Sequence, residues 1–92
     1  MGQVADVPAA PRYVITAKLN ADLENQFQLH RAFGDQAARY TAIRNAGLVF
    51  ARVIAENTPV SADQNAALRK VREAVFTANA AIACGEKDST AA

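Results

Sequence analysis

The chain has 92 residues, of which 51% are hydrophobic and 21% are charged, and its formal net charge is +1. This length fits one domain near the lower limit for a self-sufficient core, and the composition excludes a disordered chain. Acidic and basic residues are interspersed, so the sequence lacks the broad basic face of a DNA-binding protein. No signal peptide and no apolar run of about 18 residues is present, so we expect a soluble protein without a membrane span.

Histidine and cysteine each occur once, as His30 and Cys84, far apart in the sequence. A lone cysteine cannot form an intrachain disulfide, which indicates a reducing compartment. One histidine and one cysteine are too few for a metal site and are not spaced as a nucleophile pair. We therefore predict no metal, no cofactor and no catalytic activity.

The N-terminal part of the chain has little helical pattern. Residues 1–11 are small, apolar and Pro-containing, which is typical of a flexible lead-in. Residues 13–16 have strand-like composition, but no second such run exists to pair with them. We therefore predict an N-terminal extension over residues 1–19, whose second half is an extended arm that packs on a neighbour. Asn20 is then the predicted cap of a short helix that ends at Phe27.

The next segment predicts a loop and a long helix. Residues 27–34 interleave aromatic and basic groups and end at a glycine, which favours a loop. Asp35 is a suitable N-cap for a helix through about Asn57, because the following Thr58-Pro59 disfavours helical geometry.

A second long helix is predicted after a short turn. Ser61, with Gln64 three residues later, has the spacing of a capping box, and Gly85 is the expected C′ residue. Because the connection is short, this helix must fold back on the first. The predicted fold is therefore all-α, an antiparallel two-helix hairpin with a short N-terminal helix. The hairpin domain spans residues 20–85, and residues 86–92 form a flexible tail.

Apolar residues three and four positions apart define the face on which the two helices meet. We call the ten residues of this face the seam. They are Leu68, Val71, Val75, Ala78 and Ile82 on the second helix, and Tyr40, Ile43, Gly47, Phe50 and Ile54 on the first. Gly47 opposite Val75 or Ala78 would permit close backbone approach, which outweighs the roughly 1 kcal/mol that glycine costs inside a helix.

Further apolar residues lie off the seam, and two helices cannot cover them all. Val49 and Val53 fall on a flank of the first helix, while Phe76, Ala80 and Ala83 lie well around the second. An exposed patch of this kind favours a homo-oligomer of hairpins. The alternative is that the arm formed by residues 13–19 covers the flank.

Two stretches resemble a known family. The first contains Phe-Gln-Leu-His at 27–30, Gly-Asp-Gln at 34–36 and Arg-Tyr-Thr-Ala-Ile-Arg at 39–44, and the second is Arg-Glu-Ala-Val-Phe-Thr-Ala-Asn-Ala-Ala-Ile-Ala at 72–83. Together they resemble the helical-hairpin domain of phage sponge proteins, which sequester the cyclic-nucleotide signals of bacterial anti-phage immunity (CBASS). Sponges against Thoeris signalling share this hairpin. The resemblance covers about residues 22–83.

The resemblance implies a homohexamer of hairpins that catalyses nothing and removes a messenger in the cytoplasm of the infected bacterial host. The implied ligand is a cyclic dinucleotide bound between protomers or, in some members, a cyclic trinucleotide in a separate pocket. Two positions depart from the family pattern. Leu29 stands where members often have tyrosine, and Cys84 stands where a basic residue often follows Ala-Ile-Ala. Both changes remove plausible ligand contacts.

A cyclic dinucleotide presents phosphates and flat bases, which proteins bind with cations or amide donors and with aromatic or guanidinium planes. The loop and the start of the first long helix supply such groups, and Arg44 stands where the family hairpin commonly carries its ligand-clamping basic residue. The candidate ligand-binding residues are Phe27, Leu29, His30, Arg31, Arg39, Tyr40 and Arg44.

Most of these residues also have a structural interpretation. Phe27 and Phe33 could be core residues at the helix entrance, and His30 could be an exposed or capping residue. Arg39, Arg44 and Arg52 could form a solvated helix face. Asn79 could fix the register of an oligomer interface, as a lone polar group does in coiled coils, or face water. Accordingly, the alternative function is an oligomeric structural or protein-interaction module without a nucleotide ligand.

Overall fold

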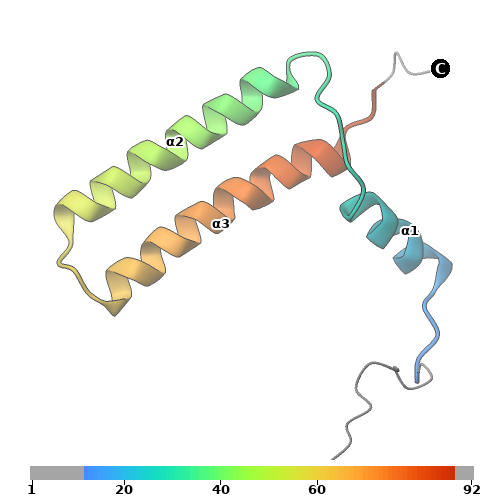
Figure 1. Ribbon diagram of the computed structural model, residues 1–92, viewed down its shortest axis with the longest axis horizontal. Helices are drawn as coiled ribbons and strands as arrows, with labels where there is room; N and C mark the ends of the chain where they lie inside the picture. The colour runs from blue at the N-terminus through green and yellow to red at the C-terminus, as the bar shows by residue number, and fades with distance from the viewer. Residues whose placement is uncertain (1–11, 89–92) are drawn as a thin grey trace, which may run out of the picture.

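The computed structural model describes residues 12–88, which form three α-helices and no strand (Figure 1). The helices are α1 (Ala17–Gln26), α2 (Gln36–Asn57) and α3 (Ala62–Gly85). The predicted all-helical fold is confirmed for these residues. The predicted lead-in, residues 1–11, and residues 89–92 of the predicted tail lie outside them. None of the three helices is long and apolar enough to cross a membrane.

Helix α1 begins four residues earlier than a cap at Asn20 predicts, so the prediction of Asn20 as its cap was wrong. Thr16 is the cap, because its extended backbone lets its side-chain oxygen accept a hydrogen bond from the Leu19 N–H (3.1 Å). Asn20 already lies inside the helix and donates from its side chain to Glu24 (3.1 Å). The last three residues of the predicted arm therefore belong to α1.

Helix α2 has the predicted ends, and Asp35 lies at its N-cap position as predicted. The Asp35 side chain, however, makes no capping bond. Its backbone angles, φ −91° and ψ 12°, depart from the extended conformation that a side-chain cap needs. At the other end Thr58 is extended, as expected of a residue before proline, and its hydroxyl donates to the Ile54 carbonyl (2.7 Å).

Helix α3 confirms one half of the predicted capping box. The Ser61 hydroxyl accepts from the Gln64 N–H (3.1 Å), but the Gln64 side chain donates to Thr58 across the turn rather than to Ser61. The prediction of Gly85 as a left-handed C′ residue was wrong. Gly85 is the last residue of α3, and the chain leaves the helix at Glu86, whose backbone is extended.

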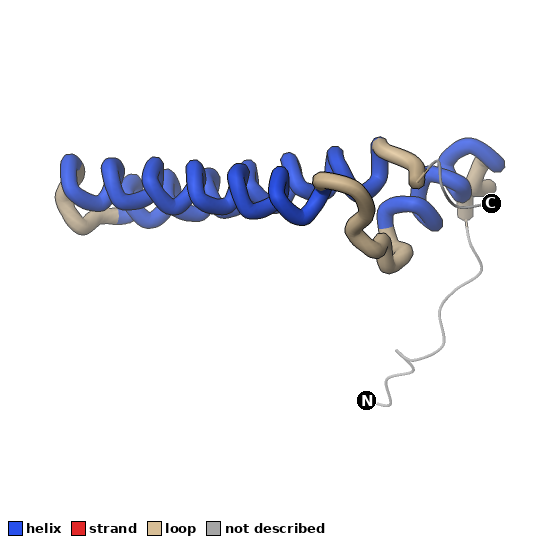
Figure 2. The backbone as a smooth tube through the Cα atoms, turned by 90° about the horizontal axis from the view of Figure 1, so that it is seen from above, coloured by secondary structure: helices blue, strands red, loops and turns tan. Residues whose placement is uncertain are grey.

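The two long helices lie side by side in a single layer, joined by the turn at residues 58–61 (Figures 1 and 2). Gly47 faces Val75 at the middle of the pair, and a Cβ atom placed on Gly47 would overlap the Val75 side chain. Nine of the ten predicted seam residues are half-buried, and Phe50 is 58% exposed. Close approach at glycine is thus the means by which α2 and α3 meet.

No hydrophobic residue of the described segment is fully buried. Two apolar grooves flank the seam. They share Gly47, Val71 and Val75 and are otherwise lined by different residues of both helices, so they lie on opposite sides of the seam. Their volumes are about 560 and about 290 Å³. Phe76, in the smaller groove, remains 57% exposed. A single chain therefore leaves many of its large apolar side chains exposed to water.

Helix α1 lies apart from this pair and touches only α3, near its C-terminal end (Figure 1). Tyr13 and Val14, which precede it, are 80% and 94% exposed. The alternative that the predicted arm covers the Phe76 flank is therefore wrong for the single chain.

Candidate functional site

The loop between α1 and α2 is fixed by a polar network that we call the latch, made of Asp35, Gln36, Arg39 and Glu86. Gln36 is its centre and is only 2% exposed. Its side-chain oxygen accepts from the Phe33 N–H, and its amide nitrogen donates to Glu86, both at 3.1 Å. Gln36 thereby joins the loop backbone to the residue that follows α3.

Arg39 completes the latch with two further bonds to Glu86. Its two terminal nitrogens donate to the two carboxylate oxygens, each at 2.7 Å, and Arg39 also binds the Asp35 carboxylate at 3.0 Å. Donation from Arg39, and then from Gln36, lowers the pKa of the Glu86 carboxyl from 4.5 to about 2. The bond to Glu86, and then the bond to Asp35, raise the pKa of Arg39 above its ordinary value. A guanidinium bound on both sides by carboxylates has little donor capacity left for a ligand phosphate.

His30 holds the other end of the loop. Its Nε2 lies 2.7 Å from the Asn25 carbonyl oxygen, which requires the proton on Nε2. The Asn25 side chain in turn donates to the Cys84 carbonyl (2.9 Å) and so connects α1 to α3. His30 thus adopts the capping role considered for it. In the neutral ring, Nδ1 is left as an acceptor.

Three of the predicted ligand-binding residues meet at one cavity. We call it the α2–α3 cavity, and its volume is about 310 Å³. It is lined by His30, Tyr40, Arg44, Asn79, Ala80 and Ala83. A guanidinium, a phenol, an imidazole and an amide converge there, while the two alanines leave one wall free of bulk. This set offers a charge for phosphate and flat groups for a base.

Asn79 is the residue of this cavity whose bonding is incomplete. Its side-chain oxygen is buried and has no hydrogen-bond partner among the described residues. Buried polar atoms in folded proteins are nearly always paired, so an orphan acceptor beside a cavity requires an explanation. The sequence drew attention to Asn79 only through the alanines around it.

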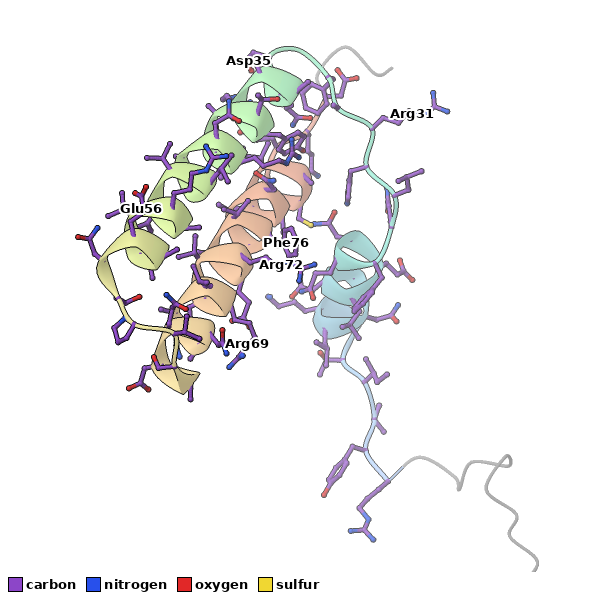
Figure 3. The ribbon with its side chains drawn as sticks, turned by 60° about the vertical axis from the view of Figure 1, so that its left-hand side comes forward. Arg31, Asp35, Glu56, Arg69, Arg72 and Phe76 are labelled. Atoms are coloured by element: carbon purple, nitrogen blue, oxygen red, sulfur yellow. The ribbon has the colours of Figure 1, made fainter. Side chains whose placement is uncertain are left out.

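The remaining predicted residues lie elsewhere. Phe27 is 84% exposed, so the alternative that it is a core residue was wrong for the single chain, and Arg31 points outward from the loop (Figure 3). Leu29 and Arg31 line a second, larger cavity of about 590 Å³ between α1, the loop and residues 83–88. Phe33 and His30 also line it, so His30 stands between the two cavities.

Two residues of the latch were missed by sequence reasoning. Gln36 entered the sequence analysis only as part of the resembling stretch at 34–36, with no role assigned to it, and Glu86 falls at the start of the predicted tail. Only the meeting of two segments 50 residues apart reveals their pairing. Across residues 12–88, no three His, Cys, Asp or Glu side chains gather in a way that could hold a metal.

The family model described as "Acb2/Tad1, hairpin domain" matches residues 19–83, which is more than two thirds of the chain. The chain has no significant match among curated proteins or among solved structures. The matched range contains all three helices except the first two residues of α1 and the last two of α3.

Proposed function

The chain belongs to the family of the Acb2/Tad1 hairpin domain, and from this premise we propose that it is a non-catalytic phage sponge. In this proposal it sequesters a cyclic di- or trinucleotide immune signal in the cytoplasm of an infected bacterium. The observation that carries the proposal is the α2–α3 cavity, where His30, Tyr40 and Arg44 come together with Asn79.

The polar groups of the cavity suit the two parts of a nucleotide, its phosphate and its base. Arg44 is exposed on α2, and no latch carboxylate is bonded to it, so its guanidinium is available for phosphate. Tyr40 precedes it by one helical turn and offers a ring on a similar face. Arg39, by contrast, is held in the latch, so in our proposal it positions the loop rather than binding ligand.

Assembly is the second part of the proposal: the α2–α3 pair acts as a hairpin within a homo-oligomer, which family membership suggests is a hexamer. The absence of a fully buried hydrophobic residue among residues 12–88 supports this, as do the grooves on both faces of the pair. A domain of this size seldom remains stable with so little apolar burial. A second chain would supply the missing contacts.

Replacing Arg44 with alanine tests ligand capture. If Arg44 clamps a phosphate, Arg44→Ala loses a charge-assisted contact of about 1.5–3 kcal/mol, which is about ten- to a hundred-and-fifty-fold in affinity. Calorimetry against a panel of cyclic di- and trinucleotides at fixed salt measures this loss. The oligomeric mass should not change.

Arg52→Ala is the matched control, because Arg52 is an exposed arginine of the same helix that lines neither cavity. General attraction between positive protein and negative ligand would weaken both variants alike and modestly. Equal losses would therefore contradict a built site. Failure of the wild type to bind any member of the panel would overturn the sponge proposal.

Replacing Phe76 with glutamate tests assembly. Phe76 is exposed. Arg72 lies beside it on α3, with its guanidinium carbon 5.2 Å from the centre of the Phe76 ring (Figure 3). A carboxylate at this position would be buried in the proposed interface, so the mass by light scattering should fall towards monomer or dimer. Thr77→Glu adds the same charge at the next, exposed residue and should leave the mass unchanged. A wild-type protein that is monomeric at tens of micromolar would refute this part.

The second candidate function is an oligomeric interaction module that has lost its ligand. Leu29 and Cys84 favour it, because neither supplies the aromatic or basic group usual at its position, and both line the larger cavity beside the loop. An assembled wild-type protein that binds no nucleotide of the panel would support this reading.

A further inference from the structure

We infer that residues 13–16 of one chain dock in the larger of the two apolar grooves of a neighbouring chain. These residues, which we call the strip, are the part of the predicted arm that precedes α1. The inference rests on the homo-oligomer of the proposed function and is independent of ligand capture. It names the segment that occupies one of the two grooves.

The strip is apolar and uncovered in the single chain. Tyr13, Val14 and Ile15 are 80%, 94% and 57% exposed, and none of them belongs to a helix. The four residues from Tyr13 to Thr16 carry no charge, and they precede the family match, which begins at residue 19. A segment of this kind gains free energy when an apolar surface removes it from water.

The position of α1 keeps the strip away from the groove of its own chain. The Asn25 side chain near the end of α1 donates to the Cys84 carbonyl (2.9 Å), which holds α1 at the C-terminal end of α3. From the other end of α1 the strip continues away from the α2–α3 pair (Figure 1). The larger groove lies at the middle of that pair, around Gly47 and Val75. With α1 in this place, only the groove of a second chain is open to the strip.

The larger groove suits the strip in length and in charge. Lys70 is the only polar residue among those that line it, and the pair is a single layer, so nothing in the chain covers it (Figure 2). Between Ile43 and Ile54, α2 runs along the groove for about 16 Å, and four extended residues span about 13 Å. The smaller groove is lined by Arg44 and Arg72, so an apolar strip there would take two guanidinium groups out of water.

A cross-link between two chains tests the docking directly. Chains with Val14→Cys and chains with Ala46→Cys, both carrying Cys84→Ala, are co-expressed and treated with oxidised glutathione. Ala46 lines the larger groove, so mass spectrometry should find a disulfide that joins position 14 of one chain to position 46 of another. Leu48→Cys replaces Ala46→Cys in the control. Leu48 is an exposed residue of the same helix that lines only the smaller groove, so this link should be at least about tenfold less abundant.

Two aspartate variants provide a second measurement without a cross-link. Val14 and Val60 are 94% and 90% exposed, so in a single chain neither Val14→Asp nor Val60→Asp disturbs packing. Docking buries only Val14. Light scattering over a dilution series should therefore show that Val14→Asp raises the concentration at which half of the assembly dissociates by about tenfold or more. Val60→Asp should leave this concentration unchanged.

The outcomes separate the docking from the proposed function. No link between positions 14 and 46, an equally abundant link to position 48, or equal dissociation of the two aspartate variants would overturn the docking. The homo-oligomer and ligand capture would still stand, with the helices of a second chain left to cover the groove. A wild-type protein that is monomeric at tens of micromolar would overturn the docking and the homo-oligomer together.

Discussion

The middle of the α2–α3 pair and its loop end are held together by different forces. At the middle, Gly47 and Val75 meet through apolar contact, with an open groove on each side. At the loop end, Gln36, Arg39 and Glu86 are joined by hydrogen bonds of 2.7–3.1 Å, and Gln36 is the one fully buried residue of the described segment.

The difference shows that the stability of the helix pair and the position of the loop depend on different interactions. Apolar contact has no directional requirement and contributes in proportion to the area removed from water, so the middle of the pair can gain stability from a second chain. Hydrogen bonds have fixed lengths and directions, so the latch can hold the loop, and His30 with it, in one place. The cavity lies where α2, α3 and that loop meet.

The largest effect is expected at the apolar middle. Val75→Asp would place a carboxylate between the helices with no partner, at a cost comparable with the whole free energy of unfolding of a small domain, about 5–15 kcal/mol. We expect loss of helical circular dichroism and of cooperative melting. Val60→Asp, in the turn where Val60 is 90% exposed, is the control and should melt like the wild type. Unchanged melting of Val75→Asp would show that the helices do not meet at this residue.

A smaller effect is expected from Gly47→Ala. The added Cβ would overlap a methyl group of Val75, whose branched side chain is stiff in a helix, so α2 and α3 must move apart. Overpacking of this kind costs about 1–3 kcal/mol, against about 1 kcal/mol gained by replacing a helical glycine. Thermal melting at fixed protein concentration should show net destabilisation.

Gly85→Ala provides the contrast, because a Cβ at Gly85 meets nothing within 4 Å and the residue does not have a positive φ. Its melting temperature should stay unchanged or rise. If the two alanine variants have the same melting temperature, the stability of the fold does not depend on close approach of the helices at Gly47.

The smallest effect on stability is expected at the latch. Glu86→Gln removes a half-exposed ion pair, which water and salt screen, so the melting temperature at pH 7 should fall only slightly. The Glu86 pKa is lower in the fold than in the unfolded chain, so its contribution is complete above about pH 4.5 and is lost as the pH falls towards 2. The difference between variant and wild type should therefore vanish near pH 2. A difference that persists there would exclude the ion pair as its cause.

The latch variant also sharpens the functional side of the comparison. Glu86 fixes the loop rather than the helix pair. Glu86→Gln should therefore weaken nucleotide binding measurably, although it lowers the melting temperature only slightly. Lys18→Gln, which removes an exposed ion pair with Asp22 on α1, is the matched control and should leave binding unchanged. Equal affinities in the two variants would mean that the latch does not position the cavity.

The sequence alone determined the features that depend on neighbouring residues. The spacing of Leu68, Val71 and Val75 predicted a helix with one apolar face, and Thr58-Pro59 followed by Ser61 predicted where one helix ends and the next begins. The candidates Tyr40 and Arg44 followed from one helical turn together with the resemblance. Such features are local, because hydrogen bonds and side-chain periodicity within a helix act over three or four residues.

Only the tertiary structure decided which distant residues meet. The sequence predicts Arg39 as a ligand contact, whereas its bond to Glu86, 47 residues away, is visible only in the structure. Gly85 is a residue type typical of a helix C′ position and Asp35 of a side-chain cap, yet Gly85 is the last residue of α3 and the Asp35 side chain binds Arg39 instead of capping α2. Asn79 lines the α2–α3 cavity, and its buried side-chain oxygen has no hydrogen-bond partner among the described residues. These outcomes depend on packing between segments, which propensity and spacing do not encode.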